Sequence, residues 1–138
     1  MPRRTTDVAV VGGGAIGLAC AWRIAQRGPS VTVIDDSVGR GASRAAAGML
    51  APVTEVHYGE EALLRLNLES SRRYPSFVQE LQEATGKDVG YRRCGTLAVA
   101  RDSDDNAALE DLYRFQMRLG LTAERLAGRD CRQLEPAL

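Results

Sequence analysis

The chain has 138 residues, enough for one modest domain with its own core. Its 18 basic and 18 acidic residues balance, so no overall field favours nucleic acid or an anionic membrane surface. No stretch approaches the roughly 18 apolar residues of a membrane span. The cysteines, Cys20, Cys94 and Cys131, lack metal-ligand spacing, so no metal site is predicted. They are predicted to be reduced thiols of a cytosolic protein, with Cys20 buried on a helix.

One feature of the N-terminus favours export from the cytosol. Arg3-Arg4 before an apolar run that ends at Cys20 resembles an export signal with a lipid-attachment cysteine. Asp7 and the glycines that follow would interrupt the apolar helix that such a signal needs. A cytoplasmic location is therefore predicted.

The first predicted element is a strand over residues 7–11, apolar and β-branched as in the buried strands of a parallel sheet. It leads into glycines spaced Gly12-x-Gly14-x-x-Gly17, the spacing of dinucleotide-binding turns. The first glycine permits the tight turn, the second lets the backbone approach a pyrophosphate, and the third lets the helix lie close to the strand. Alone this pattern is a weak signal, because a glycine-rich turn without a ligand can share it.

A helix is predicted over residues 15–27, where apolar residues recur at helical spacing until Gly28-Pro29. The N–H groups at its start, near Ala15 and Ile16, have no intrahelical partner and lie at the positive end of the helix dipole. They suit a diphosphate. A second buried strand over residues 31–34 completes a strand–helix–strand unit, for which a right-handed crossover is expected.

The acidic residue after the second strand makes the glycine motif specific. Asp35 lies 23 residues after Gly12, close to the roughly 20 expected for a carboxylate that binds the adenosine ribose. Asp36 is adjacent. These residues fit FAD and NAD equally well, so an NAD-binding Rossmann module remains an alternative at this point.

Small residues dominate the next segment, from Asp36 to Leu50. Ser43 is predicted to be the N-cap of a short helix over residues 44–47, which would offer a second set of backbone donors for phosphate. The run of alanines would let a large flat cofactor pack against the backbone. An ordinary alanine-rich helix explains the composition equally well.

The rest of the chain is predicted to be mainly helical. A helix over residues 59–85 is kinked or divided at Tyr74-Pro75 and ended by Gly86. The further predicted elements are two short strands at 89–93 and 95–100, a helix capped within 102–105 and running to 119, an extended piece at 122–126, and a last helical turn capped by Asp130.

Two segments together resemble a known family. Residues 12–35 are similar to the FAD-binding strand–helix–strand of flavoproteins, and Gly41-Ala-Ser-Arg-Ala-Ala-Ala-Gly-Met-Leu-Ala-Pro52 resembles the second FAD-contact segment of D-amino-acid oxidase-like enzymes. Within that family the segment is most similar to the glycine oxidases of thiamine biosynthesis. The resemblance covers essentially the whole chain and favours FAD, because an NAD module gives the segment after Gly41 no role.

The resemblance implies a set of cofactor contacts. Ala15 and Ile16 would contact the diphosphate, and Asp35 the ribose, with Asp36 beside it. The residues expected along the cofactor and at the flavin ring are Ala42, Ser43, Ala47, Gly48 and Met49, with Met49 also facing the substrate. The loop between Asp35 and Ala45 is one residue short of the family pattern, and aspartate stands where glutamate is common; both leave FAD binding intact in principle.

The implied fold is α/β: a Rossmann-type FAD-binding βαβ unit with parallel strands over 1–87, and at 88–138 the beginning of an α+β substrate domain, with the fold incomplete. Such enzymes are more than twice as long, and their substrate-carboxylate arginine and active-site tyrosine lie in the later part. The chain is therefore expected to be an N-terminal piece, inactive alone, and no catalytic residue is predicted in it.

The implied reaction is oxidation of glycine or short amines by O₂ and water to glyoxylate or an oxo acid, ammonia or an amine, and H₂O₂, in thiazole synthesis for thiamine. The expected partners are an amino acid and O₂, and a homo-oligomer is possible for the full-length enzyme. Alternatives are another FAD-dependent amine or D-amino-acid dehydrogenase, a sarcosine oxidase-like enzyme, the NAD module, or an inactive remnant.

Overall fold

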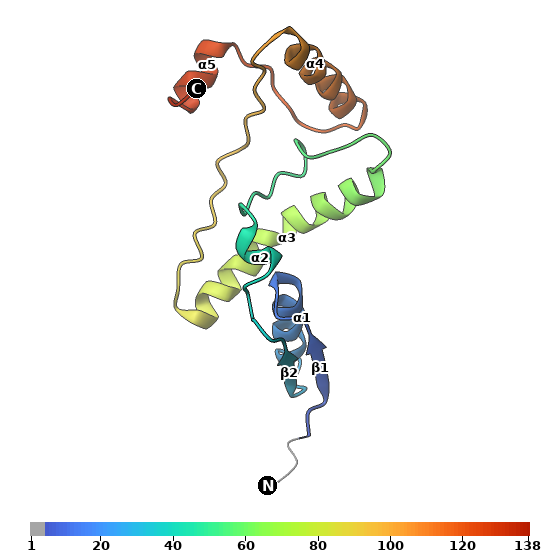
Figure 1. The fold of residues 1–138 in the computed structure, drawn as a ribbon, viewed down its shortest axis with the longest axis vertical. Coiled ribbons are helices and arrows are strands. Elements are labelled where there is room, and N and C mark those ends of the chain that lie inside the picture. Colours follow the sequence, from blue (N-terminus) through green and yellow to red (C-terminus); the bar gives the residue numbers. More distant parts are fainter. Residues whose placement is uncertain (1–4) are drawn as a thin grey trace. The chain divides into compact units, whose positions relative to one another are not determined.

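The computed structural model describes residues 5–138, so Arg3 and Arg4 lie outside it. The chain forms two compact units, an N-terminal unit up to Met49 and a C-terminal unit, Leu50–Leu138. In chain order the elements are β1 (Val8–Val11), α1 (Ala15–Ala25), β2 (Val31–Ile34), α2 (Ala42–Ala45), α3 (Glu61–Thr85), α4 (Ser103–Arg118) and α5 (Gly128–Leu134) (Figure 1). Within the described residues no helix is both long and apolar enough to cross a membrane.

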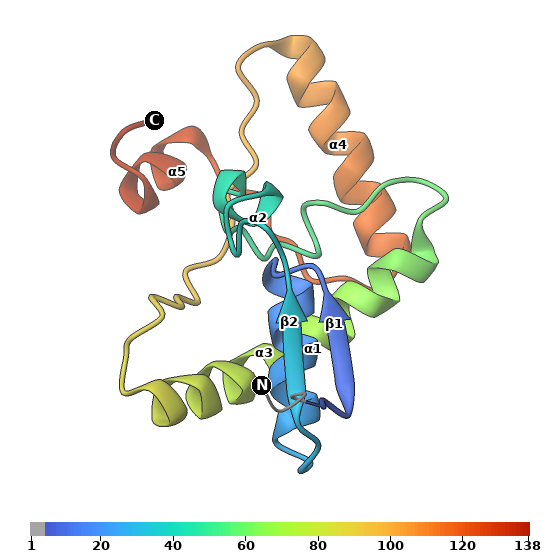
Figure 2. The same cartoon turned by 60° about the horizontal axis from the view of Figure 1, so that its bottom comes forward.

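The N-terminal unit is the predicted strand–helix–strand. Strands β1 and β2 pair in parallel, in a register that sets Val8 opposite Val31 and Val11 opposite Ile34, and α1 lies along one face of the pair (Figure 2). Alternate side chains point to opposite faces of a sheet. In this unit only one face is covered, so Val11 is 83% exposed, and burial on both faces, as expected from its sequence, is not seen.

Cys20 lies on the uncovered flank of α1 and is exposed, so its predicted burial is wrong. The buried residue of this helix is Ala21, which follows Gly17 by one helical turn on the sheet-facing side. Neighbours in a helix point about 100° apart. The apolar pattern identified the helix but not which of its small residues faces the sheet.

A polar contact fastens the starts of both strands. The Asp7 carboxylate accepts hydrogen bonds from the backbone N–H of Ser30 at 2.8 Å and from its hydroxyl at 2.7 Å. In return the Ser30 hydroxyl oxygen accepts the Asp7 N–H at 3.0 Å. The bond from the Ser30 hydroxyl, and then that from the Ser30 N–H, favour the ionised carboxylate and hold the pKa of Asp7 below its ordinary value.

The contact predicts a pH-dependent contribution to stability. A group whose pKa is depressed by folding stabilises the protein above its unfolded-state pKa, about 3.9 for aspartate, and loses that contribution as the pH falls through the folded-state pKa. The melting-temperature advantage of the wild type over Asp7→Ala should therefore shrink as the pH is lowered from about 6 to about 3. A difference that stays constant over this range would contradict the assignment.

The core of the C-terminal unit lies where the loop before α3 meets α3 and α4. Val56, Leu64 and Phe115 are its buried centre, each at most 6% exposed. The Tyr58 ring stacks on the Phe115 ring with centroids 4.0 Å apart. Partly buried leucines surround this centre: Leu68, Leu112, Leu119 and Leu121.

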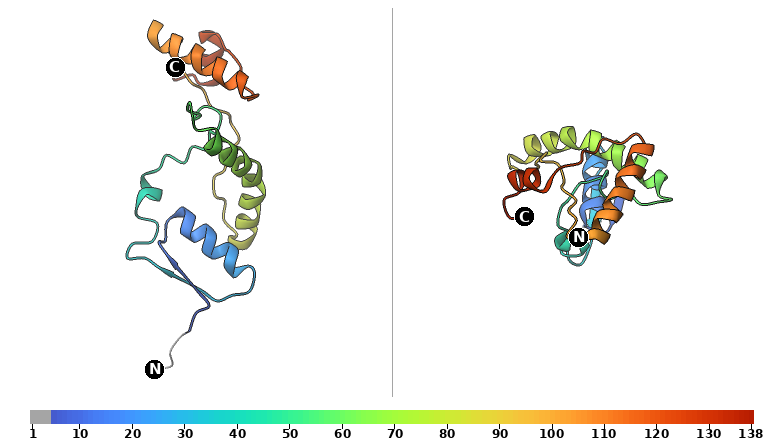
Figure 3. Two further views of the ribbon diagram at one scale, coloured as in Figure 1. Left: turned by 90° about the vertical axis from the view of Figure 1, so that its right-hand side faces the viewer. Right: turned by 90° about the horizontal axis from the view of Figure 1, so that it is seen from above.

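Helix α3 continues without a break through Pro75 (Figure 3). The segment is therefore one helix and is not divided into two at Tyr74-Pro75. It ends as predicted at Gly86, which has φ 67° and donates its N–H to the Gln82 carbonyl at 2.7 Å. Because proline has no N–H, the Ser71 carbonyl one turn earlier lacks its usual helical donor.

Replacing Pro75 with alanine should therefore stabilise the protein. The variant restores the missing donor and removes the ring clash, so the free energy of unfolding in urea should rise by roughly 1–3 kcal/mol. Gln79→Ala, an exposed change in the same helix, is the control and should move it by less than about 0.5 kcal/mol. Unchanged or lowered stability for Pro75→Ala would mean that packing of the ring outweighs its cost to the helix.

Two predicted strands, 89–93 and 95–100, are absent as strands. Their residues carry strand-forming side chains, but a strand also needs a neighbour for its backbone hydrogen bonds, and the described residues supply none here. Helix α4 is capped by Asp102, whose carboxylate accepts the N–H groups of Asp104 and Asp105, as predicted. Asp130 is not the cap of the last helix, because α5 begins earlier, with Ala127 as N-cap.

Candidate dinucleotide-binding site

The glycine turn joins β1 to α1 in a form that only glycine allows at two positions. Gly12 has φ 101°, a region that side chains disfavour. A Cβ on Gly17 would stand 1.9 Å from the Gly12 carbonyl oxygen. The helix therefore starts directly against the turn, and no side chain intervenes.

The first turn of α1 presents unused backbone donors. Its N-cap is Gly14, which has no side chain to cap the helix, and the first turn holds no acidic residue. Among residues 5–138, no acceptor contacts the N–H of Ile16 or Gly17. The Ala15 N–H donates to the Ser43 hydroxyl at 2.9 Å. A helix end of this kind attracts an anion through its dipole and its donors.

Asp35 is bound to the same turn. One carboxylate oxygen accepts the Gly13 N–H at 2.6 Å and the other accepts the Ser37 N–H at 2.5 Å. These backbone donors hold the pKa of Asp35 below its ordinary value, with that of Gly13 the larger influence. Asp35 is therefore an ionised acceptor beside the helix start, suited to hydroxyl groups.

Gly13, which was not among the predicted site residues, is the buried residue of this turn. A Cβ here would meet a Val38 methyl at 3.0 Å and the Asp35 Cβ at 3.2 Å. Its glycine character thus keeps Asp35 close enough to accept its N–H. The signal in the sequence is the run of three consecutive glycines, of which the motif uses only the outer two.

Ser43 lies inside α2 and is not its N-cap, which is Gly41. The reason is the bond described above: the Ser43 hydroxyl accepts from Ala15, so it is not available to cap its own helix. A Cβ on Gly14 would lie 3.2 Å from this hydroxyl. The structure therefore brings Ser43 from the alanine-rich segment directly to the start of α1.

The other predicted residues are exposed in the structure. Within the described part of the chain, no hydrogen bond or ion pair joins any of them to the glycine turn: Asp36, Ala42, Ala47, Gly48 and Met49. Met49 is 63% exposed. The structure thus brings together the glycine turn, the start of α1, Asp35 and Ser43, which include the residues predicted for the diphosphate and the ribose.

The hydrogen-bonding groups at the glycine turn are those that a dinucleotide needs. Unused N–H groups at a helix start, glycines that leave the backbone open and an ionised carboxylate nearby are complementary to a diphosphate next to a ribose. The sequence-family comparison decides which dinucleotide. Residues 7–138 match the DAO family, described as FAD dependent oxidoreductase. The chain belongs to this family.

Individual relatives are similar over 74% to 96% of the chain. Glycine oxidase of Geobacillus kaustophilus (strain HTA426) is 35% identical over 133 residues, which is 96% of this chain and 35% of that protein. The bifunctional protein ThiO/ThiG of Trichormus variabilis (strain ATCC 29413 / PCC 7937) is 39% identical over 102 residues, 74% of this chain and 16% of that protein. The expected resemblance to glycine oxidases is confirmed.

Solved structures of glycine oxidases contain the fold of this chain. The crystal structure from Geobacillus kaustophilus has a TM-score of 0.88 at 34% identity, covering 96% of this chain and 36% of that one. The structure from Bacillus cereus ATCC 14579 has a TM-score of 0.86 at 34% identity, covering 96% and 35%. The chain spans about a third of the length of these glycine oxidases. The family membership confirms FAD over NAD as the predicted cofactor.

Proposed function

We propose that the full-length protein is an FAD-dependent amino-acid oxidase, most like glycine oxidase. It would convert glycine, O₂ and water to glyoxylate, ammonia and H₂O₂. The observation that carries this proposal is the arrangement at the start of α1, in a chain 34% identical to a glycine oxidase of known structure. Among the described residues the N–H groups of Ile16 and Gly17 have no acceptor and suit a diphosphate, and the Asp35 carboxylate beside the turn suits a ribose.

Each part of the N-terminal unit would hold one part of FAD. The donors near Ala15 and Ile16 bind the diphosphate, and the ionised Asp35, with Asp36 beside it, accepts the ribose hydroxyls. The remaining contacts are the glycines of the turn, Gly12, Gly14 and Gly17, the residues along the cofactor, Ala42 and Ser43, and those at the flavin ring, Ala47, Gly48 and Met49. When bound, FAD supplies the hydride-accepting and oxygen-reducing chemistry.

Residues 1–87 would form the FAD-binding portion and residues 88–138 the start of the substrate portion. Met49 would face the amino-acid substrate as well as the flavin. No catalytic residue is assigned within the chain. The partners would be the amino acid and O₂, the location the cytoplasm, where the exposed Cys20 and Cys94 stay reduced, and a homo-oligomer is a further expectation for the full-length enzyme.

The similarity to ThiO/ThiG proteins supports a place in thiazole synthesis for thiamine. A secondary-amine substrate is the second candidate, because the 4-methylaminobutanoate oxidase (formaldehyde-forming) of Paenarthrobacter nicotinovorans is 33% identical over 94 residues. The two candidates differ in the amine that the substrate portion accepts and share the same FAD portion.

Purification of the full-length protein tests the proposal. It should be yellow with flavin absorbance, and it should release H₂O₂ with glycine faster than with sarcosine or D-alanine. Faster turnover of sarcosine would favour the secondary-amine candidate. A colourless protein stabilised by NAD against thermal unfolding would overturn the proposal.

A further inference from the structure

Helix α1 has no capping side chain of its own. Its N-cap is Gly14, and its first internal hydrogen bond runs from the Leu18 N–H to the Gly14 carbonyl at 2.9 Å. The three N–H groups before Leu18 belong to Ala15, Ile16 and Gly17, and they have no partner within the helix. A serine or aspartate at the N-cap would accept from the second or third of them. It would therefore occupy Ile16 or Gly17, the two donors that suit a diphosphate.

The acceptor at this helix start comes from another segment of the chain. The Ser43 hydroxyl oxygen accepts the Ala15 N–H at 2.9 Å, from 28 residues further along the sequence. In the part of the chain that the structure describes, no acceptor contacts the N–H of Ile16 or Gly17. Ser43 thus caps α1 at the first donor and leaves the next two open to a ligand.

The loop that leads to Ser43 is bound to the glycine turn on both sides of Gly13. The Asp35 carboxylate accepts the Gly13 N–H at 2.6 Å, and the Gly13 carbonyl accepts the Gly39 N–H at 2.9 Å. A Val38 methyl lies 3.0 Å from the position that a Cβ on Gly13 would take. Because these contacts hold the loop against the turn, Ser43 approaches α1 from a segment that is itself held in place.

The space for the Ser43 hydroxyl depends on Gly14. A Cβ on Gly14 would lie 3.2 Å from the hydroxyl oxygen, closer than the 3.4–4 Å of an ordinary van der Waals contact. The backbone of Gly14 has φ −80° and ψ −177°, a conformation that is open to any residue. Close approach, and not backbone conformation, therefore favours glycine at this position, and the group that approaches is the Ser43 hydroxyl.

We propose that Ser43 is a positioning residue for the diphosphate donors at the start of α1, and that Gly14 provides the space that its hydroxyl needs. This inference rests on the proposed function, in which the start of α1 binds the diphosphate of FAD. Ser43 fixes the Ala15 peptide, and with it the direction of the next two N–H groups, without using either of them. Every residue in this arrangement belongs to the N-terminal unit.

The test uses the full-length protein and the variant Ser43→Ala, which removes the acceptor. Without FAD, the Ala15 N–H should exchange with deuterium about fivefold faster, the effect of losing one hydrogen bond. A serine that only touched the cofactor would leave this exchange unchanged. The dissociation constants of FAD and of ADP, which also carries a diphosphate on a ribose, should both rise about fivefold. Ser43→Thr, which keeps a hydroxyl, should stay within about twofold of the wild type in all three measurements.

A second variant, Gly14→Ala, tests the space beside Ser43. It should speed exchange at Ala15 in the otherwise wild-type protein, because the new methyl displaces the hydroxyl by a few tenths of an ångström. In Ser43→Ala the hydroxyl is gone, so adding Gly14→Ala should cause no further change in that exchange. Exchange is the readout here, since a methyl at Gly14 would also hinder the approach of the diphosphate. Additive effects of the two changes would contradict the proposed coupling.

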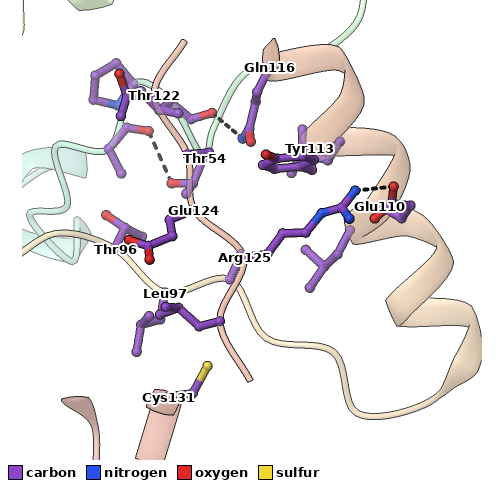
Figure 4. Close-up of a pocket in the computed structure, with 18 of the residues that line it drawn as sticks. Thr54, Thr96, Leu97, Glu110, Tyr113, Gln116, Thr122, Glu124, Arg125 and Cys131 are labelled. Carbon is purple, nitrogen blue, oxygen red and sulfur yellow. Dashed lines mark hydrogen bonds and ion pairs between the residues drawn. The ribbon is translucent and has the colours of Figure 1, made fainter. Parts of the chain in front are cut away.

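Two controls separate capping of α1 from general destabilisation. Ser76→Ala removes an exposed hydroxyl that donates to the Arg73 carbonyl at 2.9 Å. Gln116→Leu removes a side-chain donor to the Val53 carbonyl, also at 2.9 Å, at the wall of a cavity in the C-terminal unit (Figure 4). Neither variant should change the exchange at Ala15 or the affinity for ADP.

Two results for Ser43→Ala would overturn the proposal. One is wild-type exchange at Ala15, and the other is faster exchange with unchanged affinity for FAD and ADP. Changes that Gln116→Leu reproduces would overturn it as well. If the wild type binds no FAD, the proposed function fails, whereas exchange at Ala15 in Ser43→Ala still decides whether the serine caps α1.

Discussion

Replacing Gly17 with alanine is expected to abolish FAD binding by the full-length protein at micromolar concentrations. The added Cβ would stand 1.9 Å from the Gly12 carbonyl oxygen, a distance at which the backbone must move. Either the glycine turn or the start of α1 shifts, and both carry the proposed diphosphate donors. A loss of at least about 100-fold in affinity follows if the displaced helix start forfeits about 2.7 kcal/mol of binding free energy.

The measurement is a titration of the apoprotein with FAD, followed by the quenching of flavin fluorescence, together with a melting temperature. Gly128→Ala is the matched control, since its Cβ would meet nothing closer than the end of a flexible arginine at 3.7 Å. It should bind FAD like the wild type. Tight FAD binding by Gly17→Ala would mean that the close approach of helix and turn does not shape the cofactor site.

The elements that could be predicted from the sequence are those determined by neighbours along the chain. The strand at residues 31–34 was predicted to the residue, and the parallel pairing followed from a short crossover helix. The end of α3 at Gly86 and the start of α4 at Asp102 were also predicted, because a left-handed glycine and a capping carboxylate act within one helical turn.

The predictions that were wrong concern features that depend on residues far away in the chain. Residues 89–100 have strand composition, but pairing depends on a neighbouring strand that composition cannot supply. Ser43 has the chemistry of an N-cap, yet its hydroxyl accepts from Ala15, 28 residues earlier in the chain. Cys20 was placed on the right helix and the wrong face, because small residues surround it on both sides.

The candidate site was likewise predictable only in part. Spacing alone pointed to Gly12, Gly17 and Asp35. It could not reveal that the Asp35 carboxylate is held by the Gly13 N–H across 22 residues. Hydrogen bonds between residues so far apart in the chain leave no periodic pattern in the sequence. These bonds nevertheless hold the residues of the candidate site together.

Replacing Asp35 with alanine is the second change expected to have a large effect. It removes the acceptor proposed for the ribose hydroxyls and releases the N–H groups of Gly13 and Ser37 that the carboxylate now holds. Hydrogen bonds to a charged group are among the stronger ones, so FAD affinity should fall about 10- to 100-fold. Asp35→Glu should stay within about tenfold of the wild type, since it keeps the charge on a longer arm.

The control is Asp88→Ala, which removes a carboxylate that accepts the Gly90 N–H at 2.8 Å in a local turn of the same kind, outside the proposed site. It should leave FAD affinity unchanged. Because backbone donors hold the pKa of Asp35 below its ordinary value, the carboxylate stays ionised, and affinity should not change through this group between about pH 8 and pH 5. Wild-type affinity in Asp35→Ala would mean that the carboxylate only braces the glycine turn and makes no contact with the ribose.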